Sequence, residues 1–420
     1  MILANLSIPL LGAVDTAVIG HSAHAYNLSA VAIGSTIIHF IYWAFGFLRM
    51  GLTGLTAQAY GADDAVEVRT IFLRGALAAG GIGLLLWALQ VPVFSFALTL
   101  FEGSSEAESL AQTYFQIRIW SAPAVLLNYC LMGWFIGMHN TRAVLYVQVL
   151  MNGINIILDL YFVVGLGWGV AGVAWATLIA EVTAVLFGLF IYRREVNKFD
   201  PGGRYGKIWV TEKIRHMFAL NFDIFIRTIS LLFAFFFFTS QASRFGDATI
   251  AAHLVLIQFQ QFLAFGLDGF AQAAEALVGS SIGTKNKQAV RNAVVVSTKW
   301  AGGIAVGYTV VYFFAGKFII QLLTSIPDVQ AVANAFLFWV VLSPIISVWS
   351  FQLDGIFIGA TRSKEMRNGM VISLIIFVCA AFLLKENLGY GGIWLAFILF
   401  MTARAVTLGI YYPRIERDAT

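Results

Sequence analysis

The sequence predicts an all-α polytopic membrane protein with twelve transmembrane helices in two six-helix bundles. Its composition is the first indication: 60% of the 420 residues are hydrophobic and 11% are charged. The mean hydropathy is +0.82, whereas soluble domains are about one quarter charged. Recurring apolar runs of about 20 residues are the second indication, because that length crosses a bilayer as a helix. An internal repeat is the third.

In lipid, each apolar run satisfies its backbone hydrogen bonds within itself only as a helix. The first run has no basic leader and no small-residue cleavage site, so we expect no removable signal peptide. Cys130 and Cys379 each lie within an apolar run, which argues against a disulfide framework or a thiolate metal site. We expect spans near residues 1–20, 28–59, 70–100, 110–138, 143–165, 169–192, 215–243, 249–282, 290–323, 329–359, 366–384 and 391–412.

Basic residues predict the orientation of these spans. Most of the 26 Lys and Arg residues fall in the connections after the even-numbered spans, and the stretch 192–217 alone holds seven. The connection at 101–109, on the opposite side, is acidic. Because positively charged connections stay in the cytoplasm, we expect a bacterial-type inner (plasma) membrane protein with both termini in the cytoplasm. Asp15 then lies in the outer half of the first span.

Short motifs recur at a constant separation of 222 residues, which indicates an internal duplication. Each half has an even number of spans, so the halves insert the same way up, as a parallel repeat. We expect an N-lobe at 1–192, a basic cytoplasmic linker at 193–214 and a C-lobe at 215–420. The matching segments are 60–69 with 282–291, GWFIG (133–137) with GIFIG (355–359), and LGWG (166–169) with LGYG (388–391).

The two halves differ at several polar positions. A residue that only packs helices together should be kept in both halves, so the difference predicts a cation or proton site in the N-lobe alone. At the separation of 222 residues, Asp15 corresponds to Phe237, Asn155 to Phe377, Asp159 to Ala381 and Thr177 to Leu399.

Helical spacing places the predicted ion-site residues together. Asn155 and Asp159 are four residues apart and share a helix face, and Asn152 precedes Asn155 by three residues. A carboxylate at the bilayer centre costs about 2.5–3.5 kcal/mol, so Asp15 and Asp159 need partners, water or a proton. Asn and Thr177 oxygens suit the shell of a hard cation such as Na⁺ beside a carboxylate; alternatively, a carboxyl group binds a proton. A simpler interpretation is hydrogen bonding between helices.

We expect polar residues, all but one of them in the second half, to line a substrate cavity. Asp268 and Glu275 are seven residues apart, two turns along one helix face. Asp223 and Arg227 are four residues apart, a spacing that favours an ion pair. Aromatic side chains near acids would suit a flat organic cation. The predicted cavity residues are Asp15, Gln258, Gln261, Asp268, Glu275 and Asp354.

Five motifs, in this order across the spans, resemble the multidrug and toxic compound extrusion (MATE) family in its DinF-like branch, over nearly the whole chain. That family has an acid in helix 1, Asn-x-x-x-Asp in helix 5 and Thr in helix 6. Asp15, Asn155, Asp159 and Thr177 match this pattern, which forms the N-lobe cation or proton site in related proteins. The motifs are VDTAVIGH (14–21), NIILD (155–159), WATL (175–178), GLDGFAQAAEALVG (266–279) and LDGIFIGATR (353–362).

The resemblance implies a V-shaped, two-lobed secondary transporter, not an enzyme, which exports organic cations or lipophilic drugs against an inward flux of H⁺ or Na⁺. The DinF-like branch favours H⁺, and no cofactor is implied. Another branch has essential acids in helices 7 and 10; Phe237 and Asp354 stand there, which argues against a C-lobe ion site. We expect a monomer in the lipid bilayer with small-molecule substrates and no nucleic acid.

Other functions fit the sequence less well. A lipid-linked oligosaccharide or lipid flippase of the same superfamily would need a strongly basic cavity, and the intramembrane Lys and Arg residues are few and scattered. The acidic-basic signature of a major facilitator carrier is absent after the second span. None of the six His residues lies in a metalloprotease or hydrolase motif, and no nucleotide-binding loop is present. These observations argue against a membrane enzyme and against direct ATP drive.

Overall fold

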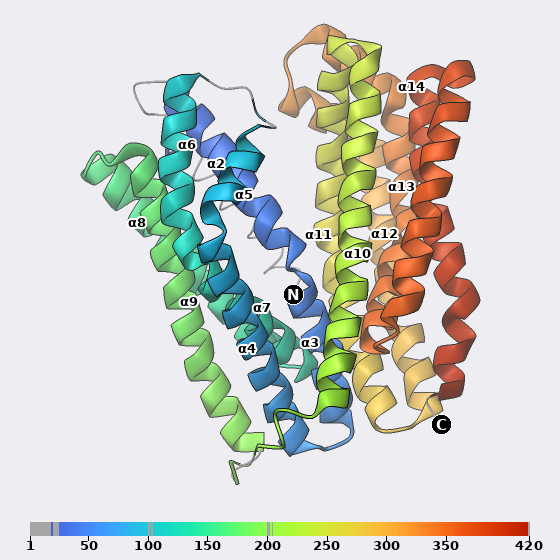
Figure 1. Cartoon of the computed structure of the whole chain (residues 1–420). Helices are drawn as coiled ribbons and strands as arrows, with labels where there is room; N and C mark the ends of the chain where they lie inside the picture. The colour runs from blue at the N-terminus through green and yellow to red at the C-terminus, as the bar shows by residue number, and fades with distance from the viewer. Residues whose placement is uncertain are drawn as a thin grey trace. The chain divides into compact units, whose positions relative to one another are not determined.

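The computed structural model describes residues 18–19, 25–99, 101, 104–199, 202–203 and 205–418. All regular elements within these ranges are helical (Figure 1). Ten segments of this part of the chain are long and apolar enough to cross a membrane. The chain divides into two compact units, and the boundary along the sequence falls between Arg215 and His216. Each unit is described by itself.

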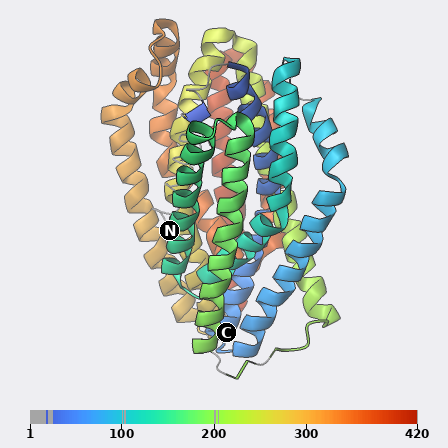
Figure 2. The ribbon, with the colours of Figure 1, turned by 90° about the vertical axis from the view of Figure 1, so that its left-hand side faces the viewer.

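Unit 1 contains shorter helices than the sequence predicted. The predicted spans 28–59, 70–100 and 110–138 are each divided into two helices, and Pro123 near the start of α7 explains one division because proline cannot continue a longer helix. Both views show α8 running beside α9 (Figures 1 and 2). The α-helices are α2 (Ala25–Ala44), α3 (Phe47–Gly61), α4 (Ala65–Ala88), α5 (Gln90–Leu98), α6 (Ser105–Arg118), α7 (Ala122–Gly137), α8 (Thr141–Asp159) and α9 (Gly169–Phe199).

The described part of the predicted linker packs on unit 1. The guanidinium of Arg74 on α4 donates hydrogen bonds to the carbonyl oxygens of Lys207 and Ile208, at 2.9 and 3.0 Å. Thr70, one turn earlier, accepts from the amide of Gly206 at 2.9 Å. The segment before α10 is therefore attached to the first half of α4.

Unit 2 is built from longer helices around an aromatic core. The side chains of Phe238, Phe377, Trp394 and Phe397 are completely buried against one another. The long element α14 contains Gly389 at φ +55°, a left-handed conformation that glycine tolerates. The predicted spans 366–384 and 391–412 lie on either side of this glycine. The α-helices are α10 (Thr211–Ala242), α11 (Asp247–Gly283), α12 (Lys287–Leu323), α13 (Pro327–Gly359) and α14 (Ser363–Asp418).

Glycines set the closest helix crossings in both units. A Cβ atom added at Gly133 on α7 would lie 2.4 Å from the carbonyl oxygen of Arg49 on α3. A Cβ atom added at Gly355 on α13 would lie 2.3 Å from the carbonyl oxygen of Ala271 on α11. Each glycine therefore allows a backbone-to-backbone approach that no other residue permits.

The helix connections also share local geometry. Asp63 and Lys285 both have positive φ, at 56° and 52°, directly before the residues that cap α4 and α12. His139 and Thr361, which follow α7 and α13, have φ of 59° and 53°. The members of each pair are 222 residues apart.

Candidate functional site

Asn155 on α8 and Thr177 on α9 form the centre of the candidate site. The Asn155 side-chain amide donates a hydrogen bond to Thr177 Oγ1 at 3.1 Å, and Thr177 Oγ1 donates to the carbonyl oxygen of Val173 at 2.9 Å. Asn155 is completely buried and Thr177 is 7% exposed. Asn155 Oδ1 accepts no hydrogen bond within the described residues. This buried acceptor suits a cation or a protonated carboxyl group.

Asp159 lies one turn after Asn155 and is also completely buried. It is the last residue of α8, and η2, a π-helix over Leu160–Gly165, begins directly after it. Single π-helical turns often occur at functional sites in α-helices. A buried acid and a buried amide thus lie one turn apart on α8, as their spacing predicted, and the amide contacts a hydroxyl group on the adjacent α9.

Asn152 lies on the same helix three residues before Asn155 and is 8% exposed. Its Oδ1 accepts a hydrogen bond from Gln148 on the same helix at 3.1 Å. The structure therefore shows Asn152 in a contact along α8, and its role in ion binding stays a prediction.

Asp15 lies outside the described residues. Ile19, four residues later in the sequence, is completely buried in a cluster with Val170, Val173 and Ala174 of α9. No group of three or more His, Cys, Asp or Glu residues that would hold a metal occurs in the part of the chain that the structure describes.

Unit 1 also contains a part-buried ion pair that the sequence did not predict. Arg118, at the end of α6, makes two hydrogen bonds to the carboxylate of Glu181 on α9, at 2.5 and 2.8 Å. Arg118 is 5% exposed, and its carbonyl oxygen accepts from the hydroxyl of Tyr42 at 3.0 Å. Glu181 lies one turn after Thr177, so the ion pair adjoins the Asn155–Thr177 contact. The signal in the sequence that could have predicted this pair is the presence of one Arg and one Glu within apolar spans.

In unit 2, Asp354 binds two arginines. It accepts hydrogen bonds from Arg227 on α10 and from Arg404 on α14, the latter at 2.6 Å. Asp354 is 6% exposed and both arginines are buried. Asp268 on α11 interacts electrostatically with Arg404. We refer to Arg227, Asp354 and Arg404 as the C-lobe triad.

The expected ion pair between Asp223 and Arg227 is wrong. Asp223 instead accepts hydrogen bonds from Arg367 at 2.6 Å and from Ser363 at 2.9 Å, both on α14. Arg227 turns to Asp354 in the C-lobe triad. Both groups pair with side chains of other helices instead of with each other along α10.

The other predicted cavity residues are dispersed on α11. Glu275 is buried, with 2% exposed, Asp268 is half-buried, and Gln258 and Gln261 are exposed. The structure brings Asp268 near the C-lobe triad, and it shows no contact that joins Gln258 to Gln261. Their contribution to a substrate cavity stays a prediction.

Comparison with known proteins identifies the family of the chain. The MatE family model matches residues 1–161 and again residues 224–384. The chain is 38% identical to DNA damage-inducible protein F of Escherichia coli (strain K12), over 100% of this chain and 91% of that protein. It is 24% identical to the probable multidrug resistance protein NorM of Xanthomonas campestris pv. campestris, over 100% and 93% of the two chains.

A solved structure described as the outward-facing conformation of a multidrug resistance MATE family transporter of the MOP superfamily has a similar fold. Its TM-score is 0.88 at 19% identity, over 99% of this chain and 94% of that chain. The matches to these two relatives cover this whole chain and at least 91% of each relative. The chain belongs to the MatE family of membrane transporters.

Proposed function

We propose that the protein is a multidrug efflux antiporter, which exports organic cations or lipophilic drugs in exchange for H⁺, or for Na⁺, by alternating access. Asn155, Asp159 and Thr177 carry this proposal: they are buried together on two apolar helices. The same positions in unit 2 hold Phe377, Ala381 and Leu399. Polar and ionisable residues are costly within a membrane, so a cluster of them that helix packing does not require indicates a functional site.

We infer that Asp15 and Asn152 complete this ion site. Asp15 precedes the buried Ile19 by four residues in the sequence, and Ile19 packs on α9, the helix that contributes Thr177. Two carboxyl groups, an amide and a hydroxyl group would then be available to a proton or a sodium ion.

We infer a fold of twelve spans in two parallel repeats, with both termini in the cytoplasm of a bacterial-type cell. Ten candidate spans lie in the described residues, one of them, α14, covers two predicted spans, and the predicted first span lies almost wholly outside. Two matches to one family model support a duplication. The paired positive-φ residues and glycine crossings, each 222 residues apart, support it further.

In the proposed cycle, substrate binds from the cytoplasm while the unit 1 carboxylates carry no ion. An ion then reaches Asp15 and Asp159 from outside, neutralises them and lowers the affinity for substrate, so that substrate leaves. One charge that moves down 100 mV releases about 2.3 kcal/mol. At about 1.4 kcal/mol per tenfold change in concentration, this supports about a fiftyfold gradient of a neutral solute.

A flippase of lipid-linked oligosaccharides is the alternative, and the ion pairs argue against it. Such a protein needs cations available for a pyrophosphate group. Arg118, Arg227 and Arg404 are instead engaged by Glu181 and Asp354. Buried arginines that already share carboxylates are poor ligands for a further anion.

The test is efflux of a fluorescent organic cation from energised cells at equal membrane expression. We expect Asp159→Asn and Asp15→Asn to abolish efflux, whereas Asp247→Asn, an exposed acid at the start of α11, leaves it unchanged. Collapse of the pH gradient, and separate removal of Na⁺, identify the coupling ion. Normal efflux by both unit 1 variants would overturn the proposed ion site, and no efflux by the wild type would favour the flippase.

A further inference from the structure

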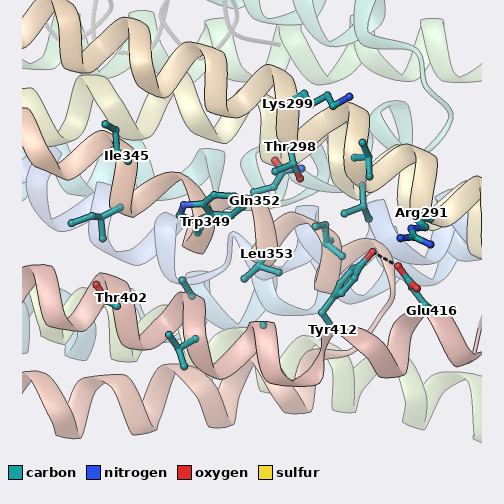
Figure 3. Close-up of a pocket in the computed structure, with 17 residues that line it drawn as sticks. Arg291, Thr298, Lys299, Ile345, Trp349, Gln352, Leu353, Thr402, Tyr412 and Glu416 are labelled. Atoms are coloured by element: carbon teal, nitrogen blue, oxygen red, sulfur yellow. Dashed lines mark hydrogen bonds between the residues drawn. The ribbon is translucent and has the colours of Figure 1, made fainter.

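A groove of about 860 Å³ lies wholly within unit 2, between α12, α13 and α14 (Figure 3). Its residues come from the first third of α12, the second half of α13 and the end of α14. In the proposed topology, the start of α12, the end of α13 and the end of α14 all lie on one side of the bilayer. The residues that line the groove therefore come from the same side. None of the predicted ion-site or cavity residues lines it.

Charged residues of α12 locate the groove along the membrane normal. Lys299 and Lys317 enclose a stretch without any charged residue, and their separation along the helix is about 27 Å. The hydrocarbon core is about 30 Å thick, so the two lysines lie near its two boundaries. Trp300, which is 68% exposed, is typical of such a boundary. With the proposed orientation, Lys299 lies at the cytoplasmic boundary.

The walls of the groove are apolar and open. Ile345, Trp349 and Val406 are 44%, 52% and 55% exposed. A Cβ atom added at Gly409, on the α14 wall, would meet no atom within 4 Å. These side chains face space that the described protein atoms do not fill, at a depth where acyl chains are the available apolar partner.

The charged end of the groove is net positive. Arg291 and Lys299 are both exposed, and neither forms an ion pair with Asp or Glu in the described part of the chain. Glu416 lies at the same end, where its carboxylate accepts a hydrogen bond from the hydroxyl of Tyr412 at 2.8 Å (Figure 3). Two cations and one engaged carboxylate leave positive charge for a headgroup.

We propose that this groove binds one anionic phospholipid of the cytoplasmic leaflet. The phosphate binds Lys299 and Arg291, and an acyl chain lies along Trp349, Ile345 and Val406. The inference rests on the proposed orientation of the spans and is independent of the transported substrate. Basic side chains near the membrane surface favour anionic lipids by electrostatic attraction, whereas a zwitterionic headgroup gains little.

The test is native mass spectrometry of the full-length protein in detergent, titrated with dioleoyl phosphatidylglycerol or with dioleoyl phosphatidylcholine. We expect the wild type to bind one phosphatidylglycerol about tenfold more tightly than phosphatidylcholine. The double variant Arg291→Gln/Lys299→Gln should lose this preference. Lys317→Gln, an exposed lysine at the other end of α12, is the matched control and should keep it.

A second variant tests the acyl-chain part of the groove. Gly409→Leu places a side chain into open space, so the fold is retained while the groove is filled. We expect it to bind less than one tenth of the phosphatidylglycerol bound by the wild type at equal lipid concentration. Equal binding of both lipids to the wild type, or unchanged binding by either groove variant, would overturn the proposal. These measurements report lipid binding alone, so their outcome does not depend on whether the proposed transport function is correct.

Discussion

Units 1 and 2 use the same backbone contacts and different charges. In unit 1, Gly133 and Gly137 of α7 lie against backbone atoms of α3; in unit 2, Gly355 and Gly359 of α13 lie against backbone atoms of α11. The contacted residues are also displaced by 222, as Arg49 and Ala271 show. The duplicated feature is therefore the close approach of two helix backbones.

The buried charges follow no such correspondence. Arg118 and Glu181 of unit 1 correspond to Val340 and Ala403 in unit 2. Asp354 and Arg404 of the C-lobe triad correspond to Met132 and Val182 in unit 1. Glycine crossings can thus be assigned to architecture, and polar groups found in one unit only become candidates for function.

The largest expected loss of stability compares the Arg118–Glu181 ion pair of unit 1 with the C-lobe triad of unit 2. Arg118→Met leaves the half-buried Glu181, whose side chain is 14% exposed, without its guanidinium, which should lower the free energy of unfolding by about 3 kcal/mol. Arg404→Met should cost less, because Asp354 keeps Arg227. Thermal unfolding of the purified protein in detergent measures both. Equal losses would show that the third charge of the triad adds no compensation.

The double variant Arg118→Met/Glu181→Gln controls for the volume change at this site. It removes both charges, so it should recover most of the stability lost in Arg118→Met. A double variant as unstable as the single one would mean that packing of the Arg118 side chain, and not its charge, stabilises unit 1.

The second prediction tests the equivalence of the two glycine crossings. Gly133→Val and Gly355→Val should each destabilise the protein by about 3 kcal/mol, because the added carbons overlap backbone oxygens that cannot move independently. Size-exclusion chromatography of fluorescently tagged protein reports the folded fraction. Gly303→Val on α12, where an added Cβ meets no atom within 4 Å, is the control. A large loss in only one unit would break the comparison.

The third prediction separates function from stability at one pair of corresponding positions. Asn155→Ala removes one neutral hydrogen bond and should cost about 1 kcal/mol, while ion-driven efflux is lost. Phe377→Ala in unit 2 removes a fully buried aromatic ring and should cost about 3–5 kcal/mol. Efflux per folded molecule should then remain close to that of the wild type. The reverse pattern would place coupling in unit 2.

The smallest effect concerns an ion-pair cluster at the start of α4. Glu67 binds Arg74 at 2.7 Å and Lys213 at 2.6 Å, and its counterpart in unit 2 is Ala289. Glu67→Ala should lower stability by less than about 1 kcal/mol, because partly exposed ion pairs gain little. The difference should shrink in high salt. A loss that is unaffected by salt would indicate a packing role.

Sequence periodicity predicted the contacts that follow the helix axis. Asn155 and Asp159, four residues apart, were expected on one helix face, and both are buried one turn apart on α8. The break at Phe45–Gly46 between α2 and α3 could not be predicted, because the apolar composition continues through it. The family assignment, by contrast, rested on the order of motifs and was confirmed.

Contacts between distant helices were beyond the reach of spacing. Arg118 and Glu181 are 63 residues apart, and Asp223 is 144 residues from Arg367. A spacing of four residues made Asp223 and Arg227 neighbours on α10, but each of them pairs with an opposite charge on another helix. In a helix bundle, a charged side chain pairs with the opposite charge that faces it. The sequence alone does not show which helix faces lie against one another.

The π-helix after Asp159 has a mechanical consequence. Over Leu160–Gly165 each backbone amide bonds one residue further back than in an α-helix. A return to the α-helical pattern would move the chain beyond it by one residue, a rotation of about 100° and a rise of about 1.5 Å. The π-helix therefore holds one extra residue directly after a buried carboxylate. A change in the charge of Asp159 would act on a segment that can rotate by one residue while it keeps its backbone hydrogen bonds.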